Sequence, residues 1–201
     1  MCARVPRGEW LLVLLIAGAE ARRAAADEAA PSPVGKRAAD VVYVATPHDV
    51  VEAMLEMAGV TKKDVLYDLG CGDGRIVATA ARRYGCKCLG FDINPERVAE
   101  SRRNVRKMGV EQLATIREQD IFELDLTPAN VVTLYLLPRL NVKLIPQLEK
   151  LAPGSRIVSH DFDMEGVEPD RAISMVSKED GVVHRIYLWT TPLKKAGEKK
   201  P

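Results

Sequence analysis

A glycine-rich segment, Tyr67–Arg75, constrains the fold more than any other part of the chain. An apolar run from Val65 precedes three glycines spaced two residues apart, and a helical pattern begins directly after them. This order predicts a strand, a tight turn and a helix N-terminus, where main-chain N–H groups approach a ligand without intervening side chains. Twenty-four residues after Asp68, a second apolar run ends in Asp92. A carboxylate at that strand end can accept hydrogen bonds from both ribose hydroxyls, so a nucleoside-containing cofactor is expected.

The spacing of the glycines indicates which cofactor to expect. The dinucleotide fingerprint requires a third glycine three residues after the second, and Arg75 occupies that position. The third glycine is instead Gly74, which gives the pattern acidic-Leu-Gly-x-Gly-x-Gly from Asp68 onwards. This pattern resembles motif I of the class I S-adenosylmethionine (SAM)-dependent methyltransferases. The resemblance implies that the glycine loop lies under the methionine part of SAM.

Further positions follow from the same resemblance. Asp68 would fix the loop or receive the ammonium group of SAM, Asp92 would bind the ribose, and Ile93 would line the adenine pocket. The run Gln119-Asp120-Ile121-Phe122 resembles the next motif of the family. In that motif an acidic side chain faces the adenine amino group and an apolar neighbour packs on the ring.

The segment from Tyr43 to Pro47 resembles a Tyr-x-x-Thr-Pro segment of a subgroup of protein lysine methyltransferases. In that subgroup the segment covers the methionine end of SAM. Thr46 can also cap a helix that begins at Pro47. The predicted cofactor-binding residues are therefore Tyr43, Thr46, Asp68, Gly70, Cys71, Gly72, Asp73, Gly74, Asp92, Ile93, Asp120 and Ile121.

Several of these polar residues also have structural interpretations. Asp68 can cap a turn, Asp73 can be a helix N-cap, and Asp120 can be an ordinary loop carboxylate. Arg75 is expected to be structural.

The acceptor side is predicted from strand ends. Methyl transfer is an in-line displacement, so catalysis requires alignment and, for oxygen or nitrogen acceptors, a destination for a proton. Tyr135, His160 and Asp161 close apolar runs and are the predicted catalytic residues. Tyr135 can equally be a core aromatic, and His160 and Asp161 a satisfied polar strand end. His48 and His184 are expected to be structural.

Strand and helix patterns alternate along the chain. Strands are predicted near residues 64–69, 86–92, 113–118, 130–136, 155–161, 170–176 and 182–190, and helices near 47–59, 74–84, 95–108 and 139–150. Such alternation implies a parallel sheet covered on both faces. No long helix separates the last two strands. With the resemblance, this predicts an α/β fold: a doubly wound, mostly parallel seven-stranded sheet with a C-terminal antiparallel hairpin and helices on both faces.

The N-terminus has the three parts of a secretory signal peptide. Arg4 and Arg7 precede a short apolar run, and three alanines at 24–26 offer a cleavage site. We expect a signal peptide or membrane segment at residues 1–26, a linker at 27–40, the methyltransferase domain at 41–191 and a disordered basic tail at 192–201. The expected location is exported, periplasmic or membrane-associated, with a cytoplasmic location as the alternative because SAM is a cytosolic metabolite.

Composition limits the partners. The formal charge of +1 argues against a polyanion partner, and the fourth strand ends without the Asn/Asp-Pro-Pro motif of base methylases, so no nucleic acid is expected. The four cysteines form no disulfide framework, and neither a CxxC pair nor a histidine cluster indicates a metal site. We expect a SAM-dependent methyltransferase that acts on a protein lysine or a small molecule. A non-catalytic SAM- or nucleoside-binding module and a dehydrogenase are the alternatives.

Overall fold

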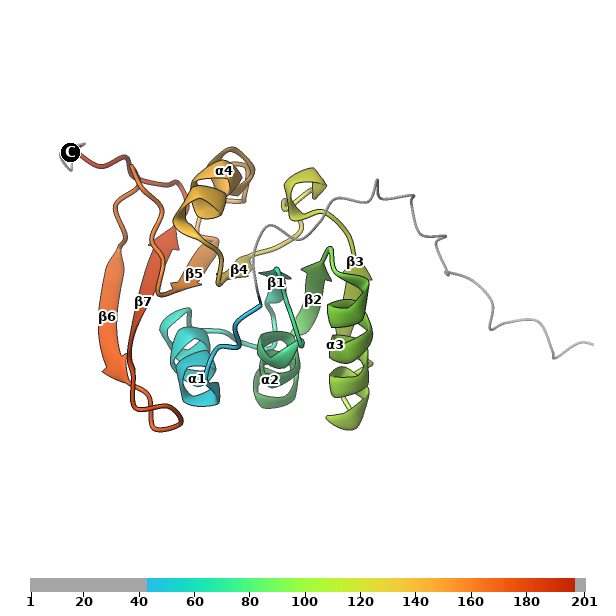
Figure 1. Cartoon of the computed structure of the whole chain (residues 1–201). Helices are drawn as coiled ribbons and strands as arrows, with labels where there is room; N and C mark the ends of the chain where they lie inside the picture. Colours follow the sequence, from blue (N-terminus) through green and yellow to red (C-terminus); the bar gives the residue numbers. More distant parts are fainter. Residues whose placement is uncertain (1–42, 198–201) are drawn as a thin grey trace, which may run out of the picture. The chain divides into compact units, whose positions relative to one another are not determined.

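A computed structural model of the chain describes residues 43–197 (Figure 1). The signal peptide or membrane segment predicted for residues 1–26 and the linker predicted for residues 27–40 lie outside the described residues. Within residues 43–197, no helix combines the length and the apolar character needed to cross a membrane.

Seven strands form one sheet in the order β3-β2-β1-β4-β5-β7-β6. The parallel strands are β1 (Val65–Leu69), β2 (Lys87–Asp92), β3 (Ala114–Glu118), β4 (Val131–Leu134) and β5 (Arg156–His160). The last two strands, β6 (Arg171–Val176) and β7 (Val183–Thr190), form an antiparallel hairpin, and β7 pairs with β5. The predicted mostly parallel sheet with a C-terminal hairpin is therefore confirmed.

Helices cover both faces of this sheet, as the alternating pattern predicts (Figure 1). One face carries α1 (His48–Met57), α2 (Arg75–Tyr84) and α3 (Pro95–Lys107). The other face carries α4 (Pro138–Leu148) and the short 3-10 helix η1 (Ile121–Glu123). The buried strand β4 shows the division, because Val131 packs in the first core and Val132 in the second. The carboxyl ends of the five parallel strands meet at one edge, where ligands bind in such sheets.

The start of α3 follows the sequence prediction. Asn94 precedes Pro95, and its side-chain oxygen accepts a hydrogen bond from the Glu96 N–H at 2.8 Å. The three described cysteines, Cys71, Cys86 and Cys88, are free and buried.

The predicted disorder from residue 192 onwards is wrong for residues 192–197. Lys195 forms an antiparallel bridge with Val167, and the Ala196 N–H donates to the Gly166 carbonyl at 2.9 Å. Leu193 packs against the second core. These main-chain bonds and this apolar contact fix a stretch whose polar composition suggested a tail.

Arg156 anchors the C-terminal end of α1 to the sheet. Its guanidinium donates to the carbonyls of Ala58 and Gly59, each at 3.1 Å, and pairs with the carboxylate of Asp64. The Asp64 side chain is only 6% exposed. The helix that Arg156 holds follows directly on the segment with Tyr43 and Thr46.

We expect Arg156→Met to lower the free energy of unfolding by about 3–5 kcal/mol, because the substitution leaves the buried Asp64 carboxylate without its cation. Urea unfolding followed by circular dichroism measures the change. The control is Arg103→Met, since Arg103 is exposed on α3. This control should stay within about 0.5 kcal/mol of the parent. A similar small change in Arg156→Met would contradict the anchoring role.

Candidate active site

A cavity of about 280 Å³ lies at the carboxyl ends of the parallel strands. Ten of the twelve predicted cofactor-binding residues line it: Tyr43, Thr46, Asp68, Gly70, Cys71, Asp73, Asp92, Ile93, Asp120 and Ile121. Gly72 and Gly74 are absent from the lining. Among the predicted catalytic residues, Tyr135 lines the cavity, whereas His160 and Asp161 do not.

The glycine loop is held onto β2 by its own N–H groups. Those of Gly70 and Cys71 donate to the Phe91 carbonyl at 2.8 and 2.9 Å. The Gly72 N–H donates to Asp92 Oδ2 at 2.9 Å. A loop that binds a pyrophosphate must leave its N–H groups for the ligand. The loop of this chain has bonded these groups to its neighbouring strand, which agrees with the exclusion of a dinucleotide by glycine spacing.

The carboxylate of Asp92 has a structural function in addition to its predicted ribose contact. While Oδ2 accepts from Gly72, Oδ1 accepts from the Asn94 N–H at 2.9 Å. Asp92 therefore joins the glycine loop to the start of α3. Each carboxylate oxygen can accept a second hydrogen bond, so these contacts are compatible with a ribose.

Asp68 has an unpaired oxygen at the cavity. Its side chain is buried, and Oδ1 accepts a hydrogen bond from Thr133 Oγ1 at 2.6 Å. Oδ2 is also buried and has no hydrogen-bond partner. Burial, followed by the nearby carboxylates of Asp92 and Asp73, raises the pKa of Asp68 to about 7. A cationic ligand group would satisfy this oxygen and favour its charged form, as the ammonium group of SAM would.

Tyr43 packs directly on the glycine loop. A Cβ atom added to Gly72, whose φ is 54°, would lie 2.0 Å from Tyr43 Cε2. On the ring of Tyr43, the guanidinium carbon of Arg97 lies 4.9 Å from the centroid, a cation–π contact. Burial and the Asp73 carboxylate raise the pKa of Tyr43 to about 12, so its hydroxyl stays protonated. Glycine is thus required at position 72 by the ring that covers it.

Arg75 joins the loop to the segment that precedes α1. It pairs with the Asp73 carboxylate at 2.7 Å, and its Nη1 donates to the Thr46 carbonyl at 2.8 Å. These contacts agree with the structural role expected of Arg75. The predicted N-cap at Asp73 is wrong by one position, because Gly74, with φ 77°, directly precedes α2. Asp73 Oδ1 still accepts from the Arg75 N–H, at 3.1 Å.

Asp120 begins η1 at the cavity edge. Its side chain accepts a hydrogen bond from the Phe122 N–H at 3.0 Å, as a loop carboxylate would. Asp120, Ile121 and Phe122 all line the cavity. The acidic side chain and the apolar neighbours that the predicted adenine contact requires therefore lie side by side at the cavity.

Tyr135 and His160 are stacked in two layers, with Tyr135 at the cavity and His160 behind it. The rings of Tyr135 and His160 lie 4.0 Å apart, and Tyr135 also stacks on Phe162 at 6.0 Å with an interplanar angle of 19°. His160 is 0% exposed. Its Nδ1 lies 3.1 Å from Thr46 Oγ1 and its Nε2 lies 2.8 Å from His184 Nδ1. Burial lowers the pKa of His160 to about 4, so the ring is neutral near pH 7.

These contacts correct two expectations. His160 was expected among the catalytic residues, but it is buried behind Tyr135 with both ring nitrogens engaged and does not line the cavity. Thr46 does not cap α1, because Pro47 precedes the helix and makes no side-chain cap. The Thr46 hydroxyl contacts His160 instead, and the first N–H of α1, from His48, donates to Glu179 Oε1 at 2.9 Å.

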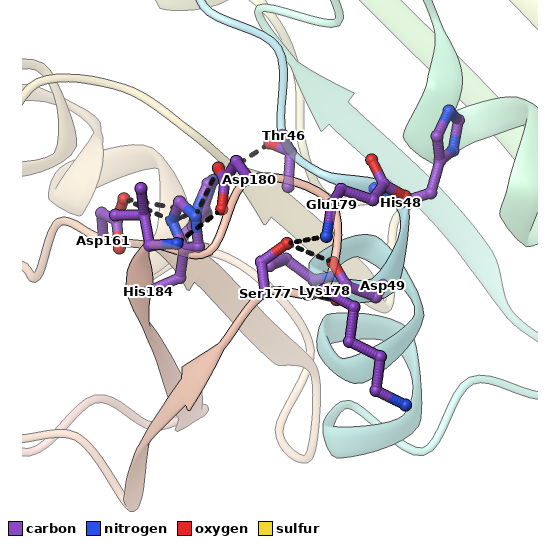
Figure 2. A network of polar contacts seen from close by, with 12 residues as sticks. Thr46, His48, Asp49, Asp161, Ser177, Lys178, Glu179, Asp180 and His184 are labelled. Atoms are coloured by element: carbon purple, nitrogen blue, oxygen red, sulfur yellow. Dashed lines mark hydrogen bonds and ion pairs between the residues drawn. The ribbon is translucent and has the colours of Figure 1, made fainter.

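The sequence analysis did not single out Arg97 and Phe162, which line the cavity. Arg97 had a usable signal, since it lies in the first turn of the helix that follows Asp92. His184, expected to be structural, contacts Asp161 Oδ2 and Asp180 Oδ2, each at 3.1 Å (Figure 2). Asp180 is only four residues before His184, but His160 and Asp161 come from a distant part of the chain, so no local pattern marked this cluster.

Known proteins resemble this chain over most of the described fold. A family model described as the ANTKMT methyltransferase domain matches residues 68–171. A protein-lysine N-methyltransferase of Saccharolobus islandicus (strain REY15A) is 47% identical over 152 residues, which cover 74% of this chain and 92% of that protein. An adenine nucleotide translocase lysine N-methyltransferase of Mus musculus is 29% identical over 131 residues, which cover 64% of this chain and 56% of that protein.

A solved structure is similar in both sequence and fold. It is the crystal structure of an RNA methyltransferase from Salinibacter ruber in complex with S-adenosyl-L-homocysteine, at 46% sequence identity and a TM-score of 0.70. The match covers 79% of this chain and 100% of that chain.

The contact between Gly72 and Tyr43 can be tested by substitution. We expect Gly72→Ala to lower the free energy of unfolding by about 2–4 kcal/mol, because it adds a clash with the ring to left-handed backbone strain. Chemical denaturation measures the loss. Gly109→Ala is the matched control, since Gly109 has φ 66° and open space around its Cβ position. It should show the strain alone, about 1–2 kcal/mol. Equal losses in the two variants would refute the packing of Tyr43 on the loop.

The unpaired oxygen of Asp68 predicts a pH dependence of SAM binding. The raised pKa of about 7 means that Asp68 becomes protonated as the pH falls below 7, which removes the charge that attracts the ammonium group. Affinity for SAM should therefore decrease from pH 8 to pH 6, as measured by isothermal titration.

Asp68→Asn isolates this effect. The variant should bind SAM about 10- to 100-fold more weakly at pH 8, the scale of a hydrogen bond to a charged group. It should also lose the pH dependence between pH 6 and pH 8. Asp125→Asn serves as the control because Asp125 is exposed and outside this cavity. If Asp68→Asn keeps the pH profile of the parent, the assignment is wrong.

Proposed function

Because this chain belongs to the family of the ANTKMT methyltransferase domain and is a class I SAM-dependent methyltransferase, we propose that its acceptor is the ε-amino group of protein lysines. The relatives from S. islandicus and mouse are both named as lysine N-methyltransferases. The S. islandicus protein supports the proposal most, since the match spans 92% of its length.

We assign the cofactor-binding roles from the contacts of the cavity. Asp68 Oδ2 would hold the ammonium group of SAM, and Asp92 would hold its ribose. Asp120 and Ile121 would hold the adenine, while Tyr43 closes the methionine end over Gly72. When bound, SAM supplies a methyl group activated by its sulfonium.

The acceptor wall is apolar and aromatic, which suits a lysine side chain. Tyr135, Leu136, Leu137 and Phe162 all line the cavity. The four-carbon stem of lysine can pack on such a surface. A lysine must also lose a proton before its nitrogen can attack, and desolvation against apolar walls lowers the pKa of a lysine ammonium. The wall therefore favours the nucleophilic, neutral amine.

Tyr135 is the residue that we place beside the acceptor nitrogen. Its ring is fixed between His160 and Phe162. Burial, followed by the charge of Asp161, raises the pKa of the Tyr135 hydroxyl, so the group stays protonated and offers both a donor and an acceptor. Tyr135 would orient the amine, and His160 would act through Tyr135 as a positioning residue.

RNA is a second candidate acceptor, because the S. ruber relative is described as an RNA methyltransferase at 46% identity. The end of β4 argues against a base amine. It presents Tyr135, Leu136 and Leu137 before Pro138, with no Asn or Asp to bind an exocyclic amino group.

Labelling with methyl-tritiated SAM separates the two acceptors. The full chain is incubated with a cell lysate in which cofactor-dependent enzymes have been heat-inactivated, and the products are treated with either protease or ribonuclease. We expect the label to survive ribonuclease, to be released by protease and to map to methyllysine by mass spectrometry. Label that is released by ribonuclease alone would favour the RNA alternative.

Tyr135→Phe tests the acceptor wall. The variant should bind SAM as the parent does but lower kcat for methyl transfer about 5- to 10-fold, the scale of one hydrogen bond. Tyr187→Phe is the control, since Tyr187 stacks on Trp189 outside the cavity. Equal kcat values in Tyr135→Phe and the parent would remove Tyr135 from the proposed site.

A further inference from the structure

Three side chains from two strands converge at one point behind the cavity wall. His160 and Asp161 come from the end of β5, and His184 comes from the start of β7. His160 Nε2 lies 2.8 Å from His184 Nδ1 and 3.2 Å from Asp161 Oδ2. The third edge of the triangle, from His184 Nδ1 to Asp161 Oδ2, is 3.1 Å.

We propose that His160 Nε2, His184 Nδ1 and Asp161 Oδ2 form a binding site for a divalent transition-metal cation such as Zn²⁺. None of the three residues lines the cavity, although His160 backs Tyr135, and the proposal stands whether or not lysine is the acceptor. The sequence analysis expected no metal, because no histidine cluster is visible along the chain.

The size of the triangle fits metal coordination. Zinc binds histidine nitrogens and carboxylate oxygens at about 2.0–2.2 Å, so two ligands lie about 2.8–3.1 Å apart at a right angle and about 3.3–3.6 Å apart at the tetrahedral angle. The three edges of this cluster, 2.8, 3.1 and 3.2 Å, are close to the right-angle spacing and would open slightly around a tetrahedral ion. Two histidines and one carboxylate on one face of an ion are also a known ligand set for transition metals.

Hydrogen bonds hold the same three atoms in the metal-free chain. His184 Nδ1 faces the Asp161 carboxylate and Nε2 faces the Asp180 carboxylate, each at 3.1 Å, so a ring protonated on both nitrogens donates to both. His160 Nε2 then accepts from His184 Nδ1. A cation at the centre would replace the proton of His184 Nδ1 and bind all three atoms together.

The outer contacts are those that metal-binding residues require. The ring nitrogen of a metal-bound histidine that faces away from the ion is usually held by a carboxylate or another polar group, which fixes the ring orientation. Asp180 holds His184 in this way, and Thr46 Oγ1 lies 3.1 Å from His160 Nδ1. Asp161 is fixed as well, since its Oδ1 accepts from the Arg185 N–H at 2.8 Å. Figure 2 shows Asp161 and Asp180 beside His184.

The backbone of Asp161 supplies an independent observation. Among residues 43–197, Asp161 is the one non-glycine residue with positive φ, at 58°. Such a conformation is uncommon for a non-glycine residue and concentrates at functional sites. It is the conformation in which the carboxylate of Asp161 reaches both histidines.

The ligand set indicates the class of ion. Imidazole nitrogens suit Zn²⁺, Fe²⁺, Co²⁺ and Ni²⁺, whereas Mg²⁺ and Ca²⁺ take oxygen ligands. The ion would join β5, β7 and Thr46 directly behind Tyr135. It would therefore act as a structural clamp on the wall of the cavity.

Metal titration of the full chain tests the proposal. The protein is purified with a chelator, dialysed and titrated with Zn²⁺ or Co²⁺, and binding is followed by calorimetry and by Co²⁺ absorption. We expect one ion per chain, a higher melting temperature with metal, and a Co²⁺ spectrum without the intense thiolate band that cysteine ligands would give.

Variants show whether these residues bind the ion. Asp161→Asn and His184→Gln keep the size of each side chain and should lose metal binding, while both remain folded by circular dichroism. Asp180→Asn, which changes an outer partner, should weaken binding about 10- to 100-fold. The third histidine of the chain, His48, is exposed and points away from the network in Figure 2. His48→Gln should therefore bind metal as the parent does.

Two results would overturn the proposal. One is the absence of stoichiometric binding by the chelator-treated parent. The other is binding that Asp161→Asn and His184→Gln leave unchanged, or that His48→Gln removes. In either case the three atoms share hydrogen bonds and no ion.

Discussion

The hydrogen bonds between the glycine loop and β2 are the interaction on which the cavity depends. The N–H groups of Gly70 and Cys71 bond to the Phe91 carbonyl, and that of Gly72 bonds to the carboxylate of Asp92. The loop is thereby rigid before any ligand arrives, and its donors are already used. A ligand without a pyrophosphate loses nothing by this arrangement, whereas a dinucleotide would lack its main-chain donors. Glycine spacing and hydrogen bonding therefore point to SAM for one physical reason.

The segment from Tyr43 to Thr46 depends in turn on that rigid loop. Tyr43 packs on Gly72. Arg75 pairs with the Asp73 carboxylate and also donates a hydrogen bond to the Thr46 carbonyl, so it links the loop to the segment. The Thr46 hydroxyl then reaches His160, which backs Tyr135. A continuous series of contacts thus runs from the loop, across the cover of the cavity, to the acceptor wall. The glycine loop and Tyr135 are therefore connected by direct contacts, although they come from distant parts of the sequence.

What the sequence predicted well was local or periodic. The loop and the strand-end carboxylates Asp68 and Asp92 were found because parallel strands bring their carboxyl ends to one edge. What it missed depends on antiparallel pairing and on main-chain partners. His184 meets His160 only through the register of β5 with β7, which no spacing along the chain encodes. The prediction of disorder around Lys195 failed because the bonds that order this stretch are main-chain bonds, which composition does not reveal.

The burial of His160 changes how the proton of the acceptor must be handled. A general base has to come within hydrogen-bond reach of the proton that it removes. His160 is fully buried behind Tyr135, with Thr46 and His184 at its two nitrogens, so it does not meet this condition. Because a sulfonium already activates the methyl group, a lysine acceptor as proposed above would need only to be neutral and aligned. Apolar desolvation at Leu136, Leu137 and Phe162 can supply the neutral form, and an immobile Tyr135 can supply the alignment. Under this proposal the histidine cluster would contribute to catalysis by holding Tyr135 in place, without a direct contact to the acceptor.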